Sequence, residues 1–74
     1  MHTFNVVYTD HAGTKREAEV TVHETNSEWP GYTGPVFYAR NLSVFGCGKK
    51  DRDPIGAVHR LVQDHGNVIA IQPR

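Results

Sequence analysis

The sequence predicts a small α+β domain in which one helix packs on one face of a three- to four-stranded, mainly antiparallel sheet. Three observations favour this fold class. Residues 53–66 carry the start and stop signals of a helix, and residues 3–24 read as two strands around a turn. Two further segments, 36–45 and 67–72, are rich in apolar and β-branched residues. The predicted order is β-β-β-α-β.

The predicted helix begins after Asp53 and ends near Gly66. The Asp53 carboxylate can accept hydrogen bonds from the free N–H groups of the first turn, and Pro54 suits the first helical position. An apolar stripe follows at helical spacing, made of Ile55, Ala57, Val58, Leu61 and Val62. Gly66 is expected to cap the helix in a left-handed conformation. Such a stripe must be buried against another element.

Residues 3–9 and 15–24 are expected to form an antiparallel hairpin, with Gly13 in the turn between them. The even-numbered residues of both strands are apolar and are predicted to face the core: Phe4, Val6, Tyr8, Ala18, Val20 and Val22. The odd-numbered residues are mostly polar: Asn5, Val7, Thr9, Glu17, Glu19, Thr21 and His23. This division predicts an outer sheet face that meets water or a polar partner.

Residues 36–45 are expected to form the third strand, although the alternation slips near Arg40. A β-bulge at that point would return both halves of the strand to the core side. The alternative is a strand that is covered on both faces, with Arg40 at an edge. Residues 46–52 then lead into the helix, and residues 67–72 form either an inner strand or one that pairs with a second copy of the chain.

Composition is that of one globular domain spanning residues 1–74, with 38% hydrophobic and 22% charged residues. The net charge of zero argues against a dedicated non-specific nucleic-acid-binding protein. Charge is nevertheless uneven, because residues 1–35 hold two basic and five acidic residues (−3) and residues 36–74 hold six basic and three acidic residues (+3). A single cysteine and the lack of a long apolar run predict a cytoplasmic protein with no membrane span.

We expect no catalytic, cofactor or metal site, and therefore no enzymatic activity. Cys47 lies between glycines and near a helix start, which can lower a thiol pKa, but no histidine close in sequence offers a base. A small buried side chain is the preferred interpretation of this cysteine. No pair among the five histidines has the spacing of a recognisable metal site: His2, His11, His23, His59 and His65.

Two sets of residues are candidate binding surfaces. The first combines the acidic second strand with an aromatic loop and would bind a basic protein partner: Glu17, Glu19, Glu28, Trp29 and Tyr32. The alternatives for this set are a solvated strand face and a tryptophan that folds back over the core. The second set would contact nucleic acid: Arg40, Lys49, Lys50, Arg52 and Arg60.

Two family resemblances accompany these patterns. Residues 4–9, 16–23 and 36–48, followed by Lys49, Lys50 and a helix from Asp53, resemble the strands and second helix of a double-stranded-RNA-binding domain. In that family a pair of lysines near the second helix contacts phosphates. The same element order resembles the N-terminal domain of HicB-type antitoxins, which binds and blocks a small toxin.

In its small size, its net charge of zero and its element order, the chain is also similar to anti-CRISPR proteins, which are small inhibitors. These resemblances imply a module from a phage or mobile element that inhibits a protein by blocking its nucleic-acid-binding surface. Direct nucleic-acid binding is the alternative function, and a homodimer is compatible with so small a core.

Overall fold

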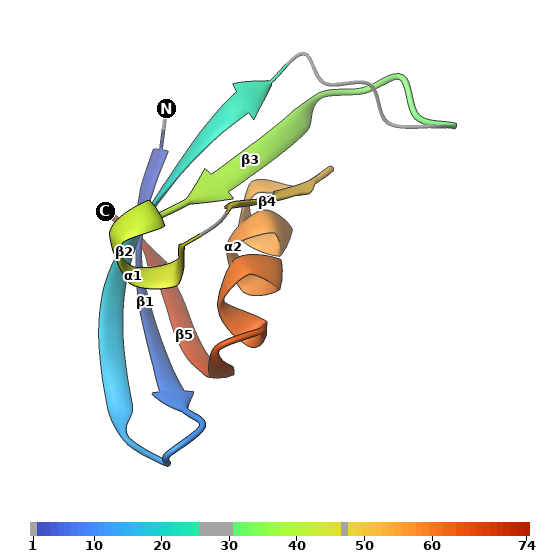
Figure 1. The fold of residues 1–74 in the computed structure, drawn as a ribbon. Coiled ribbons are helices and arrows are strands. Elements are labelled where there is room, and N and C mark those ends of the chain that lie inside the picture. The colour runs from blue at the N-terminus through green and yellow to red at the C-terminus, as the bar shows by residue number, and fades with distance from the viewer. Residues whose placement is uncertain (1, 26–30, 47) are drawn as a thin grey trace.

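The computed structural model describes residues 2–25, 31–46 and 48–74, and in these ranges it contains five strands and two helices. The strands are β1 (His2–Asp10), β2 (Lys15–Thr25), β3 (Val36–Arg40), β4 (Gly48–Asp51) and β5 (Gly66–Pro73). The helices are α1 (Leu42–Phe45) and α2 (Pro54–Gln63). The strands form one antiparallel sheet in the order β4-β3-β2-β1-β5 (Figure 1). The predicted α+β class is confirmed.

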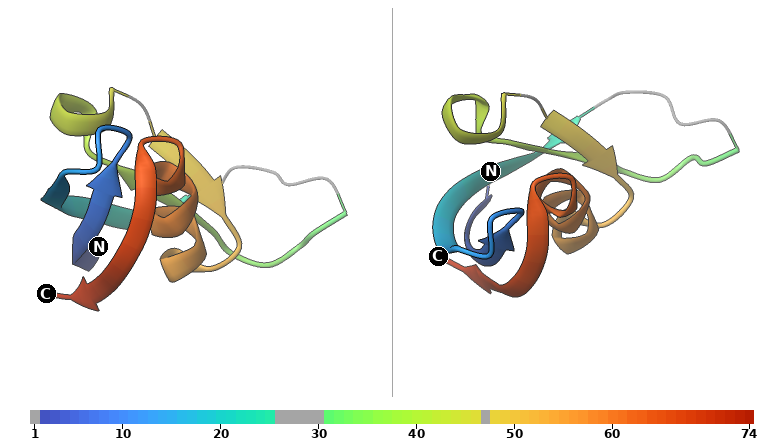
Figure 2. Two further views of the ribbon diagram at one scale, coloured as in Figure 1. Left: turned by 90° about the horizontal axis from the view of Figure 1, so that it is seen from below. Right: turned by 60° about the horizontal axis from the view of Figure 1, so that its bottom comes forward.

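The core lies between α2 and one face of the sheet. The two views in Figure 2 show α2 lying against that face. Ala57, Val58, Leu61 and Val62 of α2 are completely buried against the even-numbered residues of the hairpin, as predicted. Ile55 does not share this burial and is 42% exposed, because it lies in the first turn, before the buried part of the helix begins.

The hairpin and the start of α2 form as the sequence predicts. Asp10 accepts hydrogen bonds from the backbone N–H groups of Ala12 and Thr14, which holds the turn, and Gly13 has a φ of 84°. At the helix, the Asp53 carboxylate accepts a hydrogen bond from the N–H of Gly56 at 2.8 Å.

The third strand is shorter than predicted, and neither explanation of its irregular pattern is right. β3 ends at Arg40, and the side chain of Asn41 accepts a hydrogen bond from the N–H of Val44, which caps the short helix α1. Helical geometry leaves Leu42 and Val44 exposed and turns Phe45 into the core. Arg40 is not at an edge, because β3 lies between β2 and β4.

Phe45 explains what α1 contributes to the fold. Its ring centroid lies 5.7 Å from that of Tyr8 on β1 and 5.0 Å from that of His65 after α2. The ring therefore closes the core at the end where α2 stops.

Part of the segment that leads into α2, residues 48–51, forms a strand that the sequence does not predict. Gly48–Asp51 pairs with β3, so that Lys50 lies opposite Tyr38 and Lys49 lies opposite Ala39. Neighbouring residues of a strand point to opposite faces. The two lysines are consequently separated onto different sides of the sheet.

Gly66 has a different role from the one predicted. The helix ends at Gln63, with Asp64 as its right-handed C-cap, and Gly66 is the first residue of β5. A β-carbon at this position would lie 2.1 Å from the carbonyl oxygen of Thr9. Glycine is needed here because the two backbones approach so closely. The expectation of an inner strand is also wrong, because β5 is an edge strand that pairs with β1.

Candidate functional site

The sheet face opposite α2 is the candidate functional surface, and we call it the open face. α2 packs on the other side, against the core face of the sheet (Figure 2). The strand register places the odd-numbered residues of β1 and β2 together on the open face, with the matching residues of β3 and β4 beside them. Its central members are Asn5, Val7, Glu17, Glu19, Thr21, His23, Tyr38, Arg40 and Lys50.

One end of the open face is acidic. Glu17 lies opposite Val7 and Glu19 lies opposite Asn5, and both glutamates are exposed. Glu19 forms an ion pair with Arg74, whereas Glu17 forms no side-chain hydrogen bond or ion pair with any residue that the structure describes. Glu17 is therefore the acidic group on this face that is available to a partner.

The other end of the open face carries cationic and aromatic side chains. Arg40 lies opposite Thr21, on the strand next to the one that bears Lys50. Tyr38 lies between Lys50 on β4 and His23 on β2, and the rings of His23 and Tyr38 meet edge to face with centroids 5.4 Å apart. The open face is thus negatively charged at one end and positively charged at the other.

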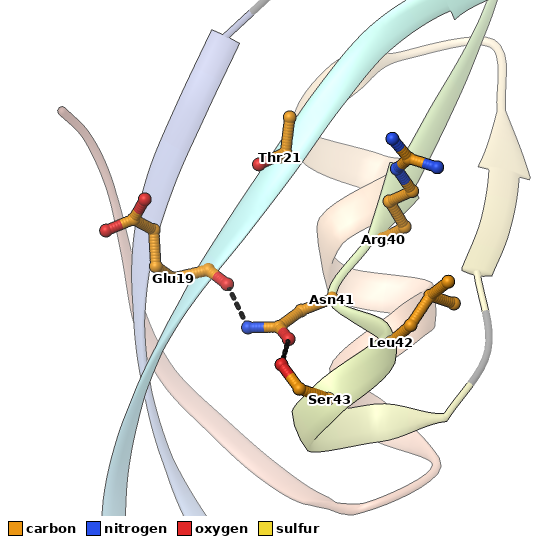
Figure 3. Close-up of a pocket in the computed structure, with 6 residues that line it drawn as sticks. All are labelled: Glu19, Thr21, Arg40, Asn41, Leu42 and Ser43. Atoms are coloured by element: carbon orange, nitrogen blue, oxygen red, sulfur yellow. Dashed lines mark hydrogen bonds between the residues drawn. The ribbon is translucent and has the colours of Figure 1, made fainter.

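A shallow pocket of about 680 Å³ lies on this face where β2, β3 and the start of α1 meet (Figure 3). Its lining residues are Glu19, Thr21, Arg40, Asn41, Leu42 and Ser43. Asn41 holds one side of the pocket together through two hydrogen bonds. Its Nδ2 donates to the carbonyl oxygen of Glu19 at 2.6 Å, and its Oδ1 accepts from the Ser43 hydroxyl at 2.9 Å. Glu19 and Arg40 project on either side of Thr21, and Leu42 adds an exposed apolar rim.

The predicted binding residues are only partly brought together. Glu17 and Glu19 share the open face as expected, whereas Glu28, Trp29 and also Cys47 lie outside the described residues. The ring of Tyr32 is covered by the guanidinium of Arg52, which lies 5.4 Å from the ring centroid. Tyr32 therefore contacts a residue of the other predicted set.

The predicted nucleic-acid set is divided by the sheet. Only Arg40 and Lys50 belong to the open face. Lys49 points to the helix side, where its Nζ lies 3.4 Å from the Asp64 carboxylate, and Arg60 of α2 donates to the backbone oxygen of Lys50 at 3.3 Å. This separation follows from β4 being a strand.

Sequence reasoning missed the pocket residues Thr21, Asn41, Leu42 and Ser43 as a group. The available signal was Asn41 itself, since asparagine favours helix N-caps, but the surrounding pattern favoured a continuous strand. Among the described residues, no group of three His, Cys, Asp or Glu side chains is arranged to hold a metal ion. Neither helix in the described part of the chain is long and apolar enough to cross a membrane.

Comparison with known proteins gives no match for this chain among protein-family models, curated proteins or solved structures. The resemblances to HicB-type antitoxins, double-stranded-RNA-binding domains and anti-CRISPR proteins stay predictions.

Proposed function

We propose that the protein is a non-enzymatic, cytoplasmic binding module that covers a basic, nucleic-acid-binding surface of another protein and thereby inhibits it. The observation that carries the proposal is the unpaired, exposed Glu17 beside Glu19 on a sheet face that α2 leaves open. Complementary charge steers association and excludes partners of the wrong sign. The neighbouring pocket, with its exposed Leu42 rim, offers a recess for one side chain of the partner.

The test is capture of a partner from nuclease-treated bacterial lysate by the immobilised protein. We compare Glu17→Lys with the double variant His59→Lys and Gln63→Lys, whose two exposed positions lie on α2. Both changes raise the net charge by two, but on opposite sides of the sheet. We expect Glu17→Lys to weaken capture of the specific partner at least about tenfold, because like charges then face each other.

The purified partner then provides the functional readout. It should release a fluorescent oligonucleotide when the wild-type protein is added, and the α2 double variant should act in the same way. Equal capture by Glu17→Lys and wild type, or a partner that keeps its nucleic acid, would contradict the proposal.

Direct nucleic-acid binding is the second candidate, favoured by Arg40 and Lys50 on neighbouring strands of the same face. Two phosphate contacts predict that log affinity for duplex DNA falls with log salt at a slope of about −1.8. Arg40→Gln should reduce the slope by about 0.9. Lys49→Gln should leave it unchanged, because Lys49 points to the helix side. No binding at low salt would remove this candidate.

A further inference from the structure

The two edges of the sheet differ in how they are protected against pairing with another chain. The β4 edge is four residues long, carries Lys49 and Lys50, and has one backbone oxygen occupied by Arg60. Short length and lysines are the usual protection of an edge strand. The β5 edge spans eight residues, Gly66–Pro73, and has no charged side chain within that range.

β5 also has apolar side chains that one copy of the chain buries incompletely. Val68 and Ile71 pack against the core but are only partly buried, and Ile69 is 57% exposed. Their exposure follows from the position of β5, which pairs with β1 along one side only. A further strand at this edge would cover them.

A register shift gives β5 a self-complementary pattern. Val68 lies opposite Tyr8 and Ile71 lies opposite Val6, so both face the core although they are three residues apart. In an unbroken strand such residues would lie on opposite faces, and the extra residue Ile69 restores them to one face.

The polar residues of β5 follow the same symmetry. Asn67 and Gln72 lie opposite Thr9 and Asn5, so both belong to the open face. An antiparallel pairing centred between residues 69 and 70 matches Asn67 with Gln72 and Val68 with Ile71. Each matched pair then lies on the same side of the sheet, as antiparallel pairing requires.

We propose that β5 pairs antiparallel with β5 of a second copy of this chain, around a two-fold axis that passes between Ile69 and Ala70. A second copy is the occupant because one set of residues satisfies both sides of the pair, as an isologous interface demands. The uncharged strand brings no like charges together at the axis. The pairing covers Ile69 and joins two five-stranded sheets so that both open faces look the same way.

This proposal is independent of the proposed function and is tested by the mass of the protein in solution. Light scattering and sedimentation should show a mass about twice the 8.3 kDa of the chain. Ile69→Lys should be a folded monomer, since the side chain is already exposed within one copy, and circular dichroism checks the fold. Val44→Lys on α1, where the side chain is 52% exposed, is the matched control and should remain dimeric. A monomeric wild type, or a dimer that survives Ile69→Lys, would overturn the proposal.

Cross-linking tests the register. In a Cys47→Ser background, Ile69→Cys and Ala70→Cys are prepared as separate variants and then mixed. Opposite residues of an antiparallel pair lie within disulfide range, so the mixture should cross-link more completely than either variant alone. Equal cross-linking in all three samples would show that the axis does not pass between these residues.

Discussion

The side-chain amide of Asn41 donates a hydrogen bond of 2.6 Å to the backbone oxygen of Glu19, which ties the start of α1 to the middle of β2. The Oδ1 of the same side chain accepts from the Ser43 hydroxyl and from the N–H of Val44. A four-residue helix is not stable by itself. Asn41 therefore holds α1 in place, and with it the wall of the pocket.

Asn41→Ala should lower the free energy of unfolding by about 1–2 kcal/mol, because it removes a helix cap and leaves the Glu19 oxygen without its partner. Urea denaturation measures the change. Ser43→Ala removes only one bond at an exposed position and should cost less than about 0.5 kcal/mol. Equal effects of the two variants would show that the bond to Glu19 contributes nothing.

Phe45→Ala should destabilise the fold by about 3–5 kcal/mol, since it empties a buried ring position next to Tyr8 and His65. That is a large share of the stability of a small domain. Chemical denaturation followed by circular dichroism measures it. The neighbouring change Val44→Ala should have little effect because Val44 is exposed. A stable Phe45→Ala variant would mean that α1 does not close the core.

Gly66→Ala should destabilise the protein by about 1–3 kcal/mol, because the added methyl group overlaps the carbonyl oxygen of Thr9 and the strands must move apart. Gly56→Ala is the comparison. There the new methyl group overlaps the movable carboxylate of Asp51 and makes an ordinary contact with the Cβ of Asp53, and alanine favours a helix by up to about 1 kcal/mol. Thermal unfolding measures both variants, and Gly66→Ala should lower the melting temperature more than Gly56→Ala does.

Asp10 should make the stability depend on pH. The hydrogen bond from Arg16, followed by those from the N–H groups of Thr14 and Ala12, holds the pKa of the Asp10 carboxyl below its ordinary value, against a weaker opposing effect of desolvation. Because the folded state binds this proton less tightly than the unfolded state, the contribution is present above the ordinary pKa of 3.8 and is lost as the pH falls through the lower folded value.

Asp10→Asn should therefore lower the melting temperature near neutral pH, and the difference from wild type should close in acid. Arg16→Gln should move the pKa of Asp10 back toward its ordinary value, which an NMR titration of the carboxyl carbon detects. A difference in melting temperature that stays constant with pH would show that Asp10 does not act through its charge.

Those parts of the fold that depend on local chemistry were predictable from the sequence. Asp53 and Pro54 mark the start of α2, and the alternation in residues 3–24 gives the hairpin and its polar face. The acidic residues Glu17 and Glu19 could be assigned to one surface for the same reason.

The parts that depend on distant partners were not predictable. Gly48–Asp51 has no apolar alternation and becomes a strand because β3 offers it an edge. Asn41 is compatible with a strand in isolation, and the bond from its Nδ2 to the carbonyl of Glu19 on β2 depends on a partner 22 residues away in sequence. Lys49 and Lys50 point to opposite sides of the sheet because they lie next to each other in β4. Which of the two lysines belongs to the open face could therefore not be predicted without that strand.

The position of β5 beside β1 has a consequence for how the chain acquires its structure. β1 precedes the other described strands in sequence, yet one of its two neighbours in the sheet is β5. The pairing of Val6 with Ile71 therefore cannot form until β5 is present. The hairpin of β1 and β2 can form early, but one side of β1 stays unpaired until residues 66–73 have been synthesised. Contacts over such long sequence separations slow folding. During translation the backbone N–H and C=O groups on that side of β1 therefore stay open to other partners until β5 has emerged.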